Sequence, residues 1–260
     1  VILVYGNARL RGTRDAAIQI HSSDKTGRGI HFLQADTVSI QHLKLSYNQC
    51  FRASGLLLNG AMTCQANKLE LQHLEFTDIN TEDALNVISS SQIELEHLTF
   101  NNCTGDGLDI DFSSGEVIGG VFREMGGDAI DLSSSNIHLK DIEIAVVADK
   151  GISVGEGSTV DVRNTRINQA YIGLANKDGS QTRASDIQLQ NCSYGFTSFR
   201  KKPFFGGGQL KVENCQLDAK ILYPYTLEEG QKLLVDGKVM VSTHTKGALA
   251  TLFYPAIFQD

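Results

Sequence analysis

The sequence predicts an all-β fold: a single-stranded, right-handed parallel β-helix, a solenoid of about 22 residues per coil. Two observations predict this fold. A short strand-like motif recurs six times at a nearly constant spacing, and a second strand-like segment lies between successive copies. No segment of useful length has the 3.6-residue period of an amphipathic helix. Strands that recur at this period favour a solenoid over other repeat folds.

The first strand of each coil alternates apolar and polar residues. Its copies are EDALNVIS (82–89), GDGLDIDF (105–112), GDAIDLSS (127–134), DKGISVGE (149–156), YIGLANKD (171–178) and SYGFTSFR (193–200). Successive central apolar residues are separated by 23, 22, 22, 22 and 22 positions, and they are Leu85, Leu108, Ile130, Ile152, Leu174 and Phe196. A small residue precedes each one, which is typical of a tight bend before a strand.

The second strand alternates in most copies as well. Its copies are LELQHLEF (69–76), IELEHLTF (93–100), EVIGGVF (116–122), IHLKDIEI (137–144), TVDVRNTRI (159–167), DIQLQNCS (186–193) and QLKVENCQL (209–217). Residues 1–60 are expected to form earlier, less regular coils. We therefore predict a β-helix over residues 1–217 and a terminal coil with a C-terminal cap or tail over residues 218–260. The apolar end of that tail would cap the solenoid or dock on a partner domain or subunit.

Composition excludes several classes of protein. The chain has 260 residues, 41% of them hydrophobic, and a formal net charge of −7, which argues against general binding to nucleic acid. No apolar run approaches the roughly 20 residues that span a bilayer. The opening VILVYGNARL lacks the features of a signal peptide, which indicates a trimmed or mature fragment. Five Cys without a CxxC spacing argue against a zinc cluster, and their odd number leaves at least one thiol without a partner in the chain.

Several motifs together resemble one bacterial group. EDALNV, GLDIDF, GDAIDLSS, DKGISVGE, IGLANKD and YGF…FRKKPFFG are similar to the β-helix domains associated with CotH kinase-like proteins, within the pectate-lyase-like superfamily. The resemblance covers about residues 20–240, and FRKKP (199–203) stands where the group has a YQKKP-type stretch. It implies the fold and a secreted or cell-surface location. It leaves activity open, because the superfamily includes lyases, hydrolases, epimerases and non-catalytic adhesive modules.

Stacked coils would turn the outward positions of the first strand into columns. One column runs Asn86, Asp109, Asp131, Ser153, Ala175, Thr197; the next runs Ile88, Asp111, Ser133, Gly155, Lys177, Phe199; the third, at the bend, runs Asp83, Asp106, Asp128, Lys150, Ile172, Tyr194. At the strand spacing of about 4.8 Å, Asp109, Asp111 and Asp131 would lie within about 5–7 Å of one another. Clustered carboxylates favour a hard cation, so these three are our predicted Ca²⁺ ligands.

The same face changes from acidic to basic along the solenoid. This gradient favours an acidic polysaccharide bound through Ca²⁺, and a Ca²⁺-assisted β-elimination is the reaction that we consider. In that hypothesis Lys150 is the first candidate for the base, and Arg200 or Lys177 neutralises the uronate carboxylate. The predicted substrate contacts are Asp106, Asp128, Lys201, Lys202 and Phe199.

Other interpretations stay open. Asp83, Asp106 and Asp128 precede Ala or Gly at a bend, where Asp often hydrogen-bonds the backbone two residues on, and Lys150 would then be an ion-pair partner of Asp128. A non-catalytic glycan-binding or structural surface module is the main alternative function, and an inverting glycoside hydrolase is a minor one. His42, His73 and His97 recur at one position of the second strand, where we expect a polar stack rather than a metal site.

Overall fold

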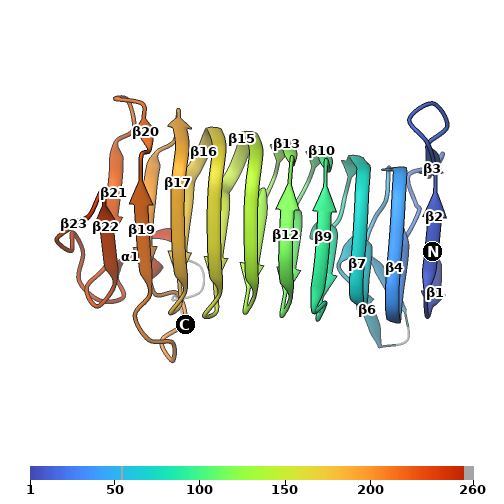
Figure 1. The fold of residues 1–260 in the computed structure, drawn as a ribbon, viewed down its shortest axis with the longest axis horizontal. Coiled ribbons are helices and arrows are strands. Elements are labelled where there is room, and N and C mark those ends of the chain that lie inside the picture. The colour runs from blue at the N-terminus through green and yellow to red at the C-terminus, as the bar shows by residue number, and fades with distance from the viewer. Residues whose placement is uncertain (54, 255–260) are drawn as a thin grey trace.

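The computed structural model describes residues 1–53 and 55–254 as an elongated solenoid with the N-terminus at one end (Figure 1). One 21-stranded sheet forms it, parallel except for the β22–β23 pair, and β5 and β6 form a separate hairpin. The strands of the first half are β1 (Ile2–Tyr5), β2 (Ala8–Arg11), β3 (Ile18–His21), β4 (Ile30–Ser46), β5 (Phe51–Ala53), β6 (Leu56–Leu58), β7 (Gly60–Ile79), β8 (Asp83–Ile88), β9 (Gln92–Glu96), β10 (Thr99–Cys103), β11 (Asp106–Asp111) and β12 (Ser114–Ile118). The remaining elements are β13 (Val121–Met125), β14 (Ile130–Ser133), β15 (Asn136–Gly155), β16 (Thr159–Lys177), β17 (Gln181–Gln190), β18 (Tyr194–Phe199), β19 (Gln209–Glu213), β20 (Gln216–Leu217), β21 (Tyr223–Leu227), β22 (Lys232–Val235), β23 (Lys238–Val239) and the helix α1 (Ala248–Phe253).

The predicted register of the coils is confirmed. Leu108 pairs with Leu85 on one side and with Ile130 on the other, and the same column continues through Ile152 and Leu174. Each of these side chains is buried. Residues about 22 positions apart along the chain are therefore direct neighbours in space, which is the condition on which the predicted columns depend.

Each coil has three faces, and the long strands β4, β7, β15 and β16 turn corners between them. We call the face that contains β8, β11, β14, β18 and the last residues of β15 and β16 the polar wall. The front face contains β9, β12 and β19 (Figure 1), and the third face contains β10 and β13. Strands β1, β2 and β3 pair in parallel with β4, so the expected early coils are present.

Identical or similar apolar side chains stack inside the solenoid. Phe76, Phe100 and Phe122 form one such stack, with ring centroids 4.8 and 4.6 Å apart. The small residue before each wall strand is explained by close approach between coils, because a Cβ on Gly107 would lie 2.7 Å from the carbonyl oxygen of Ala129. A larger side chain there would push neighbouring coils apart.

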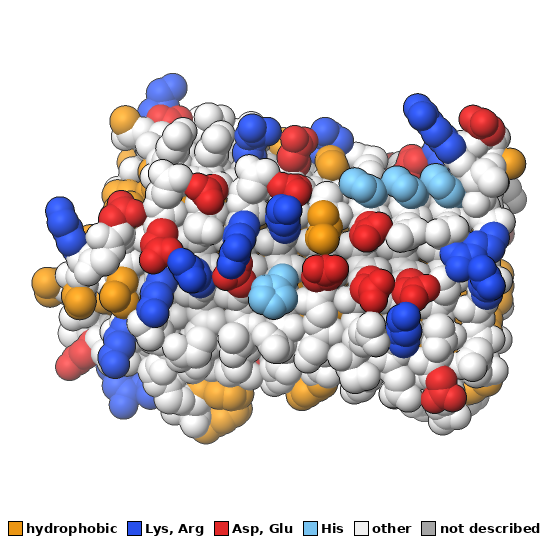
Figure 2. All heavy atoms as spheres, in the orientation of Figure 1, with side chains coloured by type: hydrophobic (Ala, Val, Ile, Leu, Met, Phe, Trp, Pro, Cys, Tyr) orange, Lys and Arg blue, Asp and Glu red, His pale blue; other side chains and the backbone are white. Residues whose placement is uncertain are grey.

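The histidine column lies at the corner between the front and third faces. His42, His73 and His97 have φ angles of 51°, 56° and 54°, a left-handed conformation that His adopts more readily than most residues. Their rings stack with centroids 4.6 and 4.9 Å apart, and Figure 2 shows them as a row. The expected stack is therefore present.

Two insertions lengthen individual coils. The β5–β6 hairpin lies in the coil between β4 and β7, and the segment 200–208 joins β18 to β19. This second segment, which we call the basic loop, carries Lys201 and Lys202 at its start. The Asp178 carboxylate fixes it by accepting the backbone N–H groups of both lysines, at 2.8 and 2.7 Å. The loop therefore has a defined position beside the polar wall.

The solenoid continues beyond residue 217 for one more coil, formed by β21 and β22. Helix α1 then packs against the outside of the polar wall, where Phe253 contacts Tyr171, Tyr194 and Phe199. Residues 255–260 of the predicted tail lie outside the described residues. All five Cys have free thiols. Within the described ranges, no helix has both the length and the apolar character needed to cross a bilayer.

Candidate ligand-binding wall

The acidic half of the polar wall is formed by strands β8, β11 and β14. Asp109 lies between Asn86 and Asp131 in the column predicted from the sequence, and Asp111 pairs with Ser133 in the next column. Inward-facing Leu108 and Ile110 are fully buried, so strand alternation directs the two aspartates outward. The wall thus begins with carboxylates stacked on neighbouring strands.

A ladder of hydrogen bonds links the carboxylates at the bend. Asp106 Oδ1 accepts the backbone N–H of Asp128 at 2.7 Å, and Asp128 Oδ1 accepts the backbone N–H of Lys150 at 2.9 Å. Each carboxylate therefore hydrogen-bonds the backbone of the next coil. Local turn chemistry had instead suggested a hydrogen bond to the backbone two residues further along the chain. Each carboxylate uses Oδ1 in this way, and the ladder fixes its direction.

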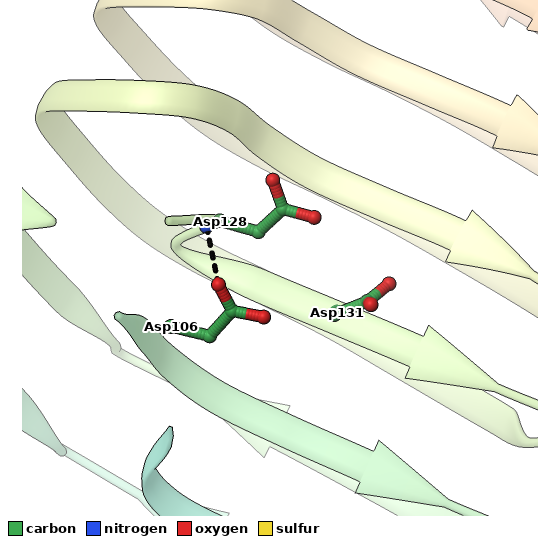
Figure 3. A group of neighbouring side chains, drawn as sticks. All are labelled: Asp106, Asp128 and Asp131. Carbon is green, nitrogen blue, oxygen red and sulfur yellow. Dashed lines mark hydrogen bonds between the residues drawn. The ribbon is translucent and has the colours of Figure 1, made fainter. Parts of the chain in front are cut away.

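Three carboxylates converge on one point of the wall. Asp106 on β11, Asp128 in the turn before β14, and Asp131 on β14 each offer an oxygen, and these oxygens lie within 4.8 Å of one another (Figure 3). Of the predicted metal ligands Asp109, Asp111 and Asp131, only Asp131 belongs to this group. Asp109 instead accepts a hydrogen bond from Asn86 Nδ2 at 2.9 Å. Asp106 and Asp128, predicted as substrate contacts, are the other two members.

Negative charge in the acidic half is poorly compensated. Burial and the charge of Asp83 raise the pKa of Asp109 to about 9, and burial and the charge of Asp106 raise the pKa of Asp83 to about 8. Burial and the charge of Asp128 raise the pKa of Asp106 to about 7. Burial and Asp131 raise the pKa of Asp111 to about 6. These carboxyls therefore lack the positive charge that would hold them ionised.

The two wall lysines are already paired. Lys150 Nζ lies 3.2 Å from Asp128 Oδ1 and 2.5 Å from Asp149 Oδ2, and its side chain is 3% exposed. Lys177 Nζ reaches back across Gly155 to within 3.8 Å of Asp131 Oδ1. Burial opposes the charge of both ammonium groups, but the facing aspartates outweigh it and raise the pKa of each lysine. Both are therefore protonated at neutral pH.

Asp131 differs from its acidic neighbours because of these lysines. Burial alone would raise its pKa, but Lys177, the Ser153 hydroxyl and Lys150 hold the pKa of Asp131 below its ordinary value. Asp131 is thus the most acidic member of the group of three. It marks the boundary between the acidic and basic halves of the wall.

The basic loop adds further cations. Lys202 Nζ pairs with Glu156 Oε1 at 2.5 Å, whereas the ammonium of Lys201 lies over the Tyr254 ring, 4.2 Å from its centroid. Burial, together with Lys177 and Lys150, lowers the pKa of Lys201. Arg200 is half-buried and precedes the two lysines in the same loop.

The basic half of the wall is covered. Ala175 and Thr197 face outward by alternation, yet both are fully buried. Phe199, predicted as a ligand contact, is also fully buried, because Phe253 packs against it with ring centroids 5.1 Å apart. The aromatic residue that the basic loop does expose is Phe204, at 81%. In this conformation a ligand reaches the acidic half of the wall but not Phe199.

Several site residues were not identified in the sequence. Glu156 and Asp178 share one corner position and lie 22 residues apart. The same period therefore marks them once the columns are continued past the end of the strand. Asp149 is the neighbour of Lys150 in sequence. Tyr254 lies outside the repeat, and no periodic signal pointed to it.

The donor set of the wall fits a hard cation. Carboxylate oxygens from three neighbouring positions are the ligands that Ca²⁺ prefers, and a divalent ion would compensate the charge that raises the neighbouring pKa values. Asp106 and Asp128 each use Oδ1 in the hydrogen-bond ladder. These hydrogen bonds fix the orientation of each carboxylate and leave its second oxygen available to coordinate a cation.

The fold and the wall together define a right-handed parallel β-helix protein with an outward-facing acidic cluster. Residues 28–219 match the family described as "Right handed beta helix region", which is most of the solenoid, and the chain belongs to this family. Comparisons with curated proteins and with solved structures find no significant match. The family establishes the fold, and the function has to be inferred from the residues of the polar wall.

Proposed function

We propose that this protein binds an acidic polysaccharide on its polar wall through a divalent cation, with Ca²⁺ the best fit to the oxygen ligands. The observation that carries the proposal is the convergence of oxygens of Asp106, Asp128 and Asp131 within 4.8 Å beside carboxyls of raised pKa. When bound there, the cation supplies positive charge and open coordination positions for a sugar carboxylate. Lys177 and Lys202 lie on the basic side and orient the same carboxylate.

Calcium binding is the first test. Titration calorimetry of the full chain with CaCl₂ should give a saturable site, and Asp106→Asn together with Asp131→Asn should weaken it at least about 100-fold, since two of three anionic ligands are lost. The matched control is Glu94→Gln, which removes a carboxylate from the front face. Unchanged calcium affinity in the double variant would exclude this site.

Polysaccharide binding is the second test. The full chain is titrated with polygalacturonate and with alginate, in Ca²⁺ and in a chelator. We expect binding in Ca²⁺ only, with a neutral glucan as control. Binding that persists in chelator would contradict the cation-mediated arrangement, and binding of the neutral glucan alone would contradict the acidic ligand.

A Ca²⁺-assisted β-elimination is a second candidate function, and the lowered pKa of Lys201 favours it. In that reaction a neutral amine removes the proton from the carbon beside the uronate carboxylate. The C–O bond on the next carbon then breaks, a C=C double bond forms between the two carbons, and the leaving sugar oxygen takes up a proton from water. Lys150 and Lys177 are poorly suited as the base because both are paired and charged. We therefore propose Lys201 for the base and assign Lys150, Lys177 and Arg200 to charge neutralisation.

Incubation with polyuronates separates this candidate from simple binding. Elimination gives unsaturated ends that absorb in the ultraviolet, and Lys201→Met should abolish them while leaving calcium affinity unchanged. New reducing ends without ultraviolet absorbance would instead identify a hydrolase. Binding without any new ends would identify the non-catalytic glycan-binding module.

We also propose a secreted or cell-surface location and an association with bacterial CotH kinase-like proteins. The resemblance of the wall motifs GLDIDF, GDAIDLSS and DKGISVGE to β-helix domains of that group supports both. Fractionation of the native host, followed by detection of the protein in the secreted or envelope fraction, tests the location.

A further inference from the structure

The C-terminal strap, which we define as residues 247–254, covers the basic half of the polar wall. It contains α1 and Tyr254 and lies outside the solenoid core. Leu249 is fully buried in an external apolar cluster with Ile172, Ala175 and Phe199. The strap is therefore seated on outward-facing positions that would otherwise meet solvent.

Tyr254 occupies the position where the wall concentrates positive charge. Its ring lies 4.2 Å from Lys201 Nζ and 5.2 Å from Lys150 Nζ, measured to the ring centroid. The Tyr254 ring over the ammonium groups is a six-membered ring of about the size of a sugar ring, but it carries no carboxylate. Its contacts with both ammonium groups are cation–π contacts. Charge-assisted hydrogen bonds between ammonium and carboxylate are stronger contacts at the same place.

The strap is attached to the wall by side-chain packing and cation–π contacts, outside the strand pairing of the solenoid. The exposed segment before it is tied to the last coil by backbone hydrogen bonds of Thr243 and His244 to Leu227 and Glu229. The Thr243 hydroxyl also accepts the Leu227 backbone N–H at 3.0 Å. The strap then begins at Gly247, with a φ angle of 83°. Phe253 and Leu249 supply most of its apolar seat. Its displacement would leave the stacked strands of the solenoid intact.

We propose that the basic half of the wall is a subsite for the carboxylated sugar ring of an acidic polysaccharide, and that the strap occupies this subsite until such a ligand displaces it. The inference rests on the proposed function and adds the regulation of the same site. The bound sugar would take the place of Tyr254, with its carboxylate toward Lys201 and the adjoining residue of the polymer toward the acidic half. The apparent affinity is then reduced by the fraction of molecules in which the strap is closed.

The test compares Tyr254→Ala with wild type in two measurements. The first is the rate at which acetic anhydride acetylates Lys201 and Lys150, followed by mass spectrometry without any ligand. The second is the affinity for oligogalacturonate and oligoalginate in Ca²⁺. We expect acetylation of Lys201 to accelerate and affinity to rise at least about tenfold, as for a site that is open in one molecule in ten.

Two variants serve as controls. Tyr254→Phe keeps the ring over the ammonium groups and should behave as wild type. Leu252→Ala removes an apolar side chain of α1 that is 46% exposed, so it should leave both measurements unchanged. Circular dichroism verifies that each variant retains the solenoid.

The outcomes separate the strap from the proposed function. Unchanged acetylation of Lys201 in Tyr254→Ala overturns the inference, because the strap would then not cover the lysine. Faster acetylation with weaker affinity also overturns it, since Tyr254 would be part of the binding site rather than its competitor. Failure of wild type and variant alike to bind any polyuronate contradicts the proposed function itself, and the inferred subsite with it.

Discussion

The polar wall and the front face are built from the same coils in the same register, yet they differ in how far their charged side chains are buried. The front face also stacks carboxylates, because Glu70, Glu94 and Glu116 share one column, but these side chains are half-buried or exposed. Charges of both signs share that face, where Arg183 pairs with Glu213 at 2.8 Å and Lys68 with Glu70 at 2.7 Å (Figure 2). On the wall, Asp83 stacks on Asp106 and Asp109 on Asp131, and burial raises the pKa of Asp83, Asp106 and Asp109. Exposed ion pairs such as those of the front face suit a solvated surface. Stacked, buried carboxylates such as those of the wall lower the stability of the fold unless a ligand compensates their charge.

The largest predicted difference concerns lysine removal. Lys150→Met leaves Asp128 buried without its partner and should lower the free energy of unfolding by about 3–5 kcal/mol. Arg183→Met on the front face should lower it by less than about 1 kcal/mol, because both partners are exposed. Urea unfolding of both variants measures the contrast, and equal losses would show that burial does not distinguish the two faces.

Calcium should stabilise the wall specifically. At 100 times the dissociation constant, Ca²⁺ should add about 2.7 kcal/mol to the free energy of unfolding. For a chain of this size that corresponds to a rise in Tm of roughly 5–10 °C in scanning calorimetry. Asp131→Asn should abolish most of the rise and Glu94→Gln none of it. A rise that survives Asp131→Asn would place the ion elsewhere.

The cation-free protein should lose stability as pH rises. The pKa values of about 7, 8 and 9 for Asp106, Asp83 and Asp109 exceed the ordinary value of 3.8, so the folded state binds protons that the unfolded state releases. Stability is therefore greatest near the ordinary carboxyl pKa and falls through about pH 9. We expect Tm in chelator to fall from pH 5 to pH 9, measured by scanning calorimetry. Asp109→Asn should reduce that slope, and a Tm that rises with pH would contradict the assignment.

The smallest effect is expected from front-face charges on ligand binding. Lys211→Ala removes an exposed cation of β19 and should change the affinity for polygalacturonate by less than about twofold, because exposed charges are well screened. Lys201→Ala is the matched wall variant and should weaken binding further. A larger loss in Lys211→Ala would move the binding surface from the wall to the front face.

The carboxylate group illustrates where prediction from sequence reached its limit. The period predicted that Asp106, Asp109, Asp128 and Asp131 lie on one wall. It did not predict the directions in which their side chains point. Asp109 turns to Asn86 of the preceding coil, while the hydrogen bond to Asp128 N–H holds Asp106 toward the group of three. These directions depend on corner geometry, which alternation along a strand does not specify.

The sequence by itself determined the solenoid, the register and the gradient from acidic to basic residues. A constant period allows only one way to stack equivalent strands, so columns in the alignment become columns in space. Only the tertiary structure decided which carboxylates converge, which lysines are paired and that Tyr254 covers Lys150 and Lys201. Those features depend on side-chain contacts at corners and on a segment outside the repeat, where no period constrains the chain.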